Sequence, residues 1–189
     1  MPSAWNFDIA ETAFAFRGYN VTNLGRTAQL LQDPRYPETV EKYLRSACET
    51  CAEDTRKQVE LLWRIKKEKE APLEHYAEAI ALVMATELAQ VQLLEEVHGV
   101  SYAKAKLAFG YSLGELTAIT CGSVFTMDEV LRIPLEMAAD SAALAHDVTM
   151  GVLFSRGPAI AEADVLRLCR QITAEGTGTI GVSAILSPN

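Results

Sequence analysis

The chain has 189 residues, of which 49% are apolar and 22% charged, and its formal net charge is −8. This balance is typical of a globular domain that buries a core. The negative charge argues against general nucleic-acid binding, because the phosphate backbone would repel the chain. No apolar run approaches the ~20 residues that span a bilayer, and residues 1–8 lack the features of a secretion signal. We therefore expect a cytoplasmic protein without a nucleic-acid or membrane partner.

The N-terminal half combines one short apolar run with long helical patterns. Residues 12–16 are apolar and precede Gly18, which predicts a buried strand that enters a turn. Residues 26–32 predict a short helix, and residues 38–69 predict one or two longer helices. Residues 72–98 predict a helix that is buried on most sides, because its middle is apolar nearly all round.

The next segment predicts a strand that passes directly into a helix. Residues 106–110 form the strand, and the helix runs to about Cys121. Thr126 and Glu129 have the spacing of a capping box for a further helix. Pro134 lies inside that helical pattern and predicts a kink or a break.

The last forty residues predict a separate strand–helix–strand unit. Residues 150–154 and 179–186 predict the strands, and residues 161–175 predict the helix. The alternation of strands and helices predicts an α/β fold with a largely parallel sheet. We expect an α/β core over residues 1–148 and the start of a smaller subdomain over residues 149–189. Such a unit leaves strand edges without partners, which favours an incomplete fold.

The most informative motif lies where the predicted strand at 106–110 becomes a helix. Gly110, Ser112 and Gly114 form a Gly-x-Ser-x-Gly pattern. A serine on a sharp strand-to-helix turn is pushed clear of the backbone, and its neighbours must be small because the turn is crowded. The N–H of Leu113 then points at a developing oxyanion, and the helix N-terminus favours negative charge. The pattern predicts that Ser112 is a nucleophile; a strand–helix turn without chemistry is the alternative.

The chain resembles a known family around this serine. Residues 109–118, with the sequence FGYSLGELTA, resemble the GHSLGEYxA segment of malonyl-CoA:acyl-carrier-protein transacylases. These proteins share a core with the acyltransferase domains of polyketide and fatty-acid synthases. Residues 13–20 resemble the family's first strand and its FPGQG loop, and residues 122–132 resemble the segment after the nucleophile helix. Residues 151–189 resemble the start of the family's ferredoxin-like small subdomain.

The resemblance implies a hydrolase-like core with a parallel sheet and a nucleophile elbow, in which Gly110, Tyr111 and Gly114 surround Ser112. Ser112 would attack the thioester of an acyl-CoA, and the acyl-serine would pass its malonyl-type group to an acyl carrier protein. The setting would be fatty-acid or polyketide synthesis. The resemblance implies no metal and no cofactor, with acyl-CoA as the substrate.

The oxyanion site implied by the resemblance uses two backbone N–H groups, those of Leu113 and Tyr19. The sequence departs from the family at both places, since Tyr111 replaces a histidine and Arg17-Gly18-Tyr19 replaces Pro-Gly-Gln. A backbone donor survives a change of side chain, so Tyr19 remains a candidate.

The sequence also departs from the family at the position that selects a malonyl group. Malonyl-selective members carry an arginine on the helix after the elbow, where it binds the substrate carboxylate. An ungapped count from Ser112 places this position at Met137. We therefore expect either a substrate without a free carboxylate or a substitute arginine, Arg17 or Arg132.

No histidine of this chain lies in a motif that marks it as the base for Ser112. His75 and His98 flank the helix predicted at 72–98, and His146 ends a later helical pattern. The family's histidine comes further downstream. We therefore expect an N-terminal portion of a longer acyltransferase, or a naturally short and inactive homologue.

Two other groups of residues allow both a functional and a structural interpretation. Cys48 and Cys51 form a Cys-x-x-Cys on one helix face, which fits small core residues better than a metal or redox site. Lys104 and Lys106 precede the strand at 106–110 and fit solvent-facing lysines better than a contact to phosphates or an acidic carrier.

Two other functions remain open. A serine esterase would use the same turn with water as the acceptor. A non-catalytic, acyltransferase-like binding module would explain the substituted family positions and the missing base. A phosphate-binding loop is excluded, because the segment lacks the Gly-Lys-Ser/Thr ending that grips phosphate.

Overall fold

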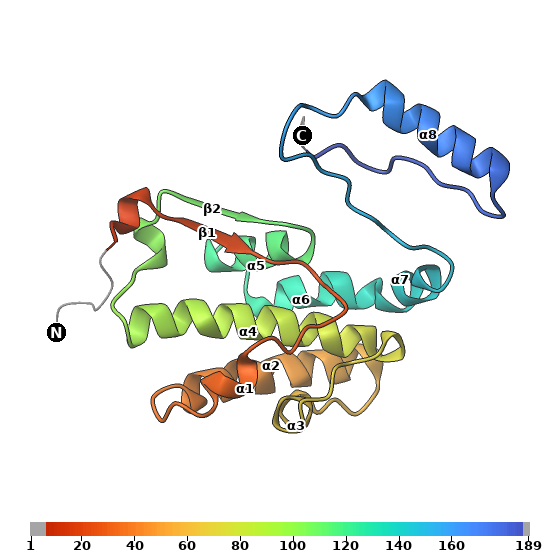
Figure 1. Cartoon of the computed structure of the whole chain (residues 1–189). Helices are drawn as coiled ribbons and strands as arrows, with labels where there is room; N and C mark the ends of the chain where they lie inside the picture. Colours follow the sequence, from red (N-terminus) through yellow and green to blue (C-terminus); the bar gives the residue numbers. More distant parts are fainter. Residues whose placement is uncertain (1–6, 187–189) are drawn as a thin grey trace. The chain divides into compact units, whose positions relative to one another are not determined.

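The computed structural model describes residues 7–186 of the chain, which divides into two compact units at Asp147/Val148. The chain is a mixed α/β protein with a two-stranded parallel sheet. The predicted α/β class is therefore confirmed at this coarse level. The first unit carries the sheet and most of the helices (Figure 1).

Two long helices form the centre of the first unit. These are α2 (Pro37–Thr55) and α4 (Tyr76–Glu96), which pack side by side (Figure 1). On α2 the buried apolar residues recur at the helical spacing that defines one face. They are Val40, Leu44, Ala47 and Cys51.

Helix α4 is buried on most sides, as its apolar pattern predicts. Every residue from 79 to 85 is buried, because α4 also contacts α5 (Leu113–Cys121), α6 (Met127–Glu136) and α7 (Ala138–Ala145). The segment Leu73–Glu96 is long and apolar enough to cross a bilayer by length and composition alone, with 67% of its apolar window buried inside the protein. Burial of this kind is what the core helix of a globular domain shows.

The sheet consists of β1 (Ala13–Phe16) and β2 (Leu107–Gly110), which pair in parallel with Phe16 opposite Gly110. Helix α5 lies between this sheet and α4 (Figure 1). The outward side chains of β2, Leu107 and Phe109, are exposed. Parallel strands are normally covered on both faces, so one face of this sheet is uncovered in the described residues.

The remaining elements of the first unit are short. They are η1 (Ile9–Glu11), α1 (Thr27–Leu30), α3 (Leu61–Lys66), η2 (Leu73–His75) and η3 (Tyr102–Lys104), where η denotes a 3₁₀ turn. The predicted capping box is present at the start of α6, with Thr126 and Glu129 bonded reciprocally. Pro134 lies inside α6, and the helix breaks at Met137 before α7 begins.

The second unit corrects two predictions. Its helix α8 (Glu162–Glu175) forms, but neither 150–154 nor 179–186 is a strand. A strand requires a neighbour for its backbone N–H and C=O groups, and no such ladder forms within the described part of this unit. Two hydrogen bonds connect α8 to the segment that follows it. The Thr173 hydroxyl accepts the Ile180 N–H at 3.0 Å and donates to the Ile180 carbonyl oxygen.

Candidate active site

Ser112 occupies a strained turn between a strand and a helix. It lies two residues after the end of β2 at Gly110 and immediately precedes α5, with φ 55° and ψ −120°. L-residues seldom adopt such dihedrals, which cost about 1–3 kcal/mol and persist only where the surroundings impose them. The residue is exposed. The turn therefore places the Ser112 hydroxyl at the protein surface.

Two glycines make this turn possible, and each is needed for space. A Cβ on Gly110 would lie 2.0 Å from the carbonyl carbon of Gly114. A Cβ on Gly114 would lie 2.3 Å from the carbonyl oxygen of Phe16. Both distances are far below van der Waals contact, so the end of β2, the start of α5 and the end of β1 meet backbone to backbone.

The start of α5 supplies amide hydrogens beside Ser112. The N–H of Gly114 donates to the Tyr111 carbonyl at 3.0 Å, and the N–H of Glu115 donates to the Ser112 carbonyl at 2.9 Å. Leu113 is the first residue of α5, and a first helical N–H has no partner within its helix.

The loop after β1 lies against the Ser112 turn. A Cβ on Gly18 would be 2.8 Å from the Tyr111 carbonyl oxygen and 3.2 Å from the Ser112 Cβ. Tyr19 follows in this loop, and its ring packs edge-on against Tyr76 at the start of α4, with ring centroids 4.7 Å apart. The structure therefore brings Gly18, the residue before Tyr19, next to Ser112, although the two segments are about 90 residues apart in the sequence.

A buried carboxylate behind the turn was not predicted from the sequence. Glu87, in the middle of α4, is 9% exposed. Its Oε1 accepts the backbone N–H of Arg17 at 2.7 Å, and its Oε2 accepts the Thr117 hydroxyl at 2.7 Å. Burial raises the pKa of the Glu87 carboxyl, and these two hydrogen bonds oppose the rise. The signal in the sequence is an acidic residue inside a mostly apolar helical segment, next to Thr86.

The three candidates for acyl selectivity have other contacts. The guanidinium of Arg17 donates to Oδ1 of Asn23 at 3.0 Å and to its carbonyl at 3.2 Å. Arg132 on α6 forms ion pairs with two carboxylates near the end of α2, including Glu53 at 2.7 Å. Met137 is 61% exposed where α6 meets α7. The Arg17 guanidinium thus stabilises the loop after β1, and the Arg132 guanidinium connects α6 to α2.

Two of the three histidines have partners in the fold. Nδ1 of His75 contacts the Glu78 carboxylate, which also pairs with Arg64 at 2.5 Å. Nε2 of His98 lies 2.9 Å from the Tyr36 hydroxyl. His146 follows α7 and is exposed. These contacts assign no histidine to Ser112.

The cysteines and lysines fit structural roles. Burial raises the pKa of the Cys48 thiol and raises that of Cys51 to about 12. Within residues 7–186, no group of three or more His, Cys, Asp or Glu side chains is arranged to hold a metal ion. Lys106 pairs with Glu11 at 2.5 Å, and Lys104 is exposed.

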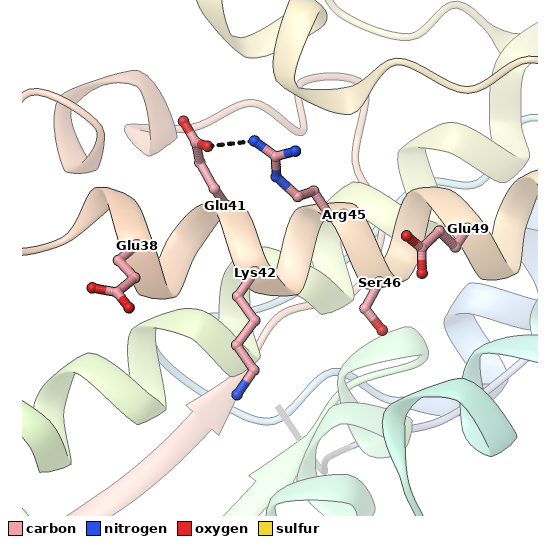
Figure 2. A pocket seen from close by; sticks show the side chains of 6 residues that line it. All are labelled: Glu38, Glu41, Lys42, Arg45, Ser46 and Glu49. Carbon is pink, nitrogen blue, oxygen red and sulfur yellow. Dashed lines mark hydrogen bonds and ion pairs between the residues drawn. The ribbon is translucent and has the colours of Figure 1, made fainter.

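Two surface hollows lie away from the turn. One, of about 470 Å³, runs along the outer side of α2, where Glu41 and Arg45 pair with each other (Figure 2). All of its lining side chains come from this one helix, so no groups converge on a ligand. A second hollow, of about 590 Å³, lies at the other end of α5 and is lined by Cys121 and Phe125 among others.

Comparison of the chain with protein-family models, with curated proteins and with solved structures finds no match. Functional inference therefore depends on the Ser112 turn and the residues around it.

Proposed function

We propose that the chain carries the nucleophile and oxyanion site of a serine acyltransferase with a hydrolase-like core. The observation that carries the proposal is the conformation of Ser112 between a strand and a helix. Its φ is 55°, and the residue is exposed. Gly110 and Gly114 flank it where no side chain fits. This combination supports a nucleophile elbow, in which a strained turn presents the serine hydroxyl.

The proposed reaction has two steps. Ser112 Oγ attacks the thioester carbonyl carbon of an acyl-CoA, the C–S bond breaks, and the CoA thiol leaves with the serine proton. The thiol of an acyl carrier protein then attacks the acyl-serine ester, and Ser112 recovers its proton. The N–H groups of Leu113 and Tyr19 hold the oxyanion in both steps. The N-terminus of α5 adds a favourable field for this negative charge.

The proposal assigns no general base within the described residues. His75 and His98 are engaged by Glu78 and Tyr36. A serine without a nearby proton acceptor is a weak nucleophile. We therefore expect acylation by this chain alone to be slow and to require long incubation.

The test is formation of a covalent adduct. The full chain is incubated with malonyl-CoA or acetyl-CoA, and its intact mass is recorded over time. We expect one acyl group on the wild-type chain and none on Ser112→Ala. Ser123→Ala is the matched control, because Ser123 is also exposed with a positive φ of 58° but follows the C-terminal end of α5. An adduct that persists unchanged in Ser112→Ala would remove the proposal.

The same measurement addresses acyl selectivity and the acceptor. Since Met137 stands where the family's arginine is expected, we expect malonyl and acetyl groups to be accepted at rates within about tenfold, or 1.4 kcal/mol. Addition of acyl carrier protein should discharge the acyl-serine faster than water does. Equal discharge with and without the carrier would favour the esterase.

A further inference from the structure

We propose that Glu87 is a positioning residue, which fixes the loop after β1 against the turn that carries Ser112. The inference rests on the proposed function and deepens it. It names a side chain that reaches no substrate and acts through the two backbone segments it joins.

The geometry joins both halves of the proposed oxyanion site to one carboxylate. Arg17, bonded to Oε1 of Glu87, lies two residues before Tyr19. Thr117, bonded to Oε2, lies on α5 five residues after Ser112. The two carboxylate oxygens have a fixed separation, so these bonds hold the loop and α5 in one relative position.

The carboxylate itself has little freedom to move. Glu87 lies on the buried part of α4, where Leu88 and Ala89 are also buried. Its two partners, the Arg17 N–H and the fully buried Thr117 hydroxyl, are both 2.7 Å away. Charge-assisted hydrogen bonds of this length are among the stronger ones in proteins.

A second carboxylate fixes the far end of the same loop. Oε2 of Glu70 accepts the N–H of Asn23 at 2.8 Å, and Oε1 accepts the N–H of Leu24 at 3.1 Å. The loop is thus held at Arg17 by one carboxylate and at Asn23–Leu24 by another. Gly18, which touches the Ser112 turn, lies beside the Glu87 end.

Packing alone does not account for this residue. A carboxylate in a buried position loses hydration, and a leucine or methionine would fill the same space without that cost. This cost is offset by two hydrogen bonds, one of them to the hydroxyl of Thr117, which is fully buried. Both donor groups belong to the segments that frame the oxyanion site.

The experiment compares Glu87→Leu and Glu87→Gln with Glu95→Gln, an exposed carboxylate two turns further along α4. For each variant of the full chain we measure the rate of Ser112 acylation at several malonyl-CoA concentrations, by intact mass. Hydrogen exchange of the peptide covering residues 15–20 reports whether the loop is held. Thermal unfolding reports whether the variant is folded.

We expect Glu87→Leu to lower the saturating acylation rate by about 100-fold, because a shift of about 1 Å in a positioning group has an effect of this size, and complete loss of one oxyanion donor costs about 10²–10³-fold. The malonyl-CoA concentration for half-maximal rate should change little, and the 15–20 amides should exchange faster. Glu87→Gln should retain the rate within about fivefold, because its amide can accept from Arg17 and donate to the Thr117 hydroxyl. Glu95→Gln should match the wild type.

A folded Glu87→Leu chain that acylates Ser112 at the wild-type rate would overturn the inference. If Glu87→Leu does not fold, Thr117→Val replaces it, because this change removes one of the two hydrogen bonds at nearly constant volume. A Thr117→Val chain with the wild-type acylation rate and wild-type hydrogen exchange of residues 15–20 would also overturn the inference. A wild-type chain that is never acylated at Ser112 would overturn the proposed function, and this inference with it. That failure is visible before any variant is compared.

Discussion

Replacement of Gly114 by alanine tests whether backbone contact shapes the Ser112 turn. Helix propensity alone predicts that Gly114→Ala stabilises α5, by up to about 1 kcal/mol. The close approach of Gly114 to the Phe16 carbonyl oxygen predicts that the substitution destabilises the protein instead. The new Cβ would lie 2.3 Å from the Phe16 carbonyl oxygen, so that oxygen must retreat by about 1 Å to reach an ordinary contact of 3.4 Å.

The magnitude follows from what that movement disrupts. The Phe16 carbonyl accepts the N–H of Tyr111 at 3.1 Å, and this bond ties β1 to the turn. Loss of the bond costs about 1 kcal/mol, and overpacking costs about 1–3 kcal/mol more. Against the gain in propensity, we expect Gly114→Ala to lower the free energy of unfolding by about 2 kcal/mol.

Urea unfolding followed by circular dichroism measures this change, with Gly122→Ala as the control at the other end of α5. Gly122 has φ −73°, and a Cβ there would lie 3.4 Å from its nearest neighbour, the Ile119 carbonyl oxygen. Its replacement should be neutral or stabilise by about 0.4–1 kcal/mol. Equal stability of the two variants would refute the close approach at Gly114.

Two further predictions concern buried groups outside the turn. Thr86 is 8% exposed, and its hydroxyl lacks a hydrogen-bond partner within residues 7–186. Thr86→Val should therefore raise the free energy of unfolding, measured in urea, by about 1 kcal/mol. A variant less stable than the wild type would contradict this prediction. Burial raises the pKa of the Cys51 thiol from 9.0 to about 12, so its contribution to stability is complete below pH 9 and is lost between pH 9 and 12. The stability difference between the wild type and Cys51→Ala should therefore narrow as the pH rises from 9 toward 12, and a difference that stays constant would show that the thiol ionises freely.

Local signals in the sequence predicted the elements that have local causes. The capping box at Thr126 and the strand-to-helix change around Ser112 depend on residues close together in the chain, and the apolar pattern that marks α4 as a buried helix lies within the helix itself. The alternation of strands and helices predicted a largely parallel sheet, and β1 and β2 do pair in parallel, but which strands pair was not predicted. Such features depend on spacing and residue type, which are visible without coordinates.

The features that the sequence did not predict depend on distant partners. Glu87 bonds to Arg17, 70 residues away, and to Thr117, 30 residues away, and no periodic pattern reports such pairs. The apolar runs at 150–154 and 179–186 have strand-like composition, but they form no ladder in the described residues. Composition indicates a preference for extended backbone, whereas a strand needs a neighbour.

The most direct test of the central claim is to locate the acyl group after incubation with malonyl-CoA. The full chain is digested under acidic conditions, and each acylated peptide is sequenced by mass spectrometry. The account predicts an oxygen ester at Ser112 and none at Ser123, the other exposed serine with positive φ that borders α5. An unmodified Ser112, or equal acylation of both serines, would contradict it.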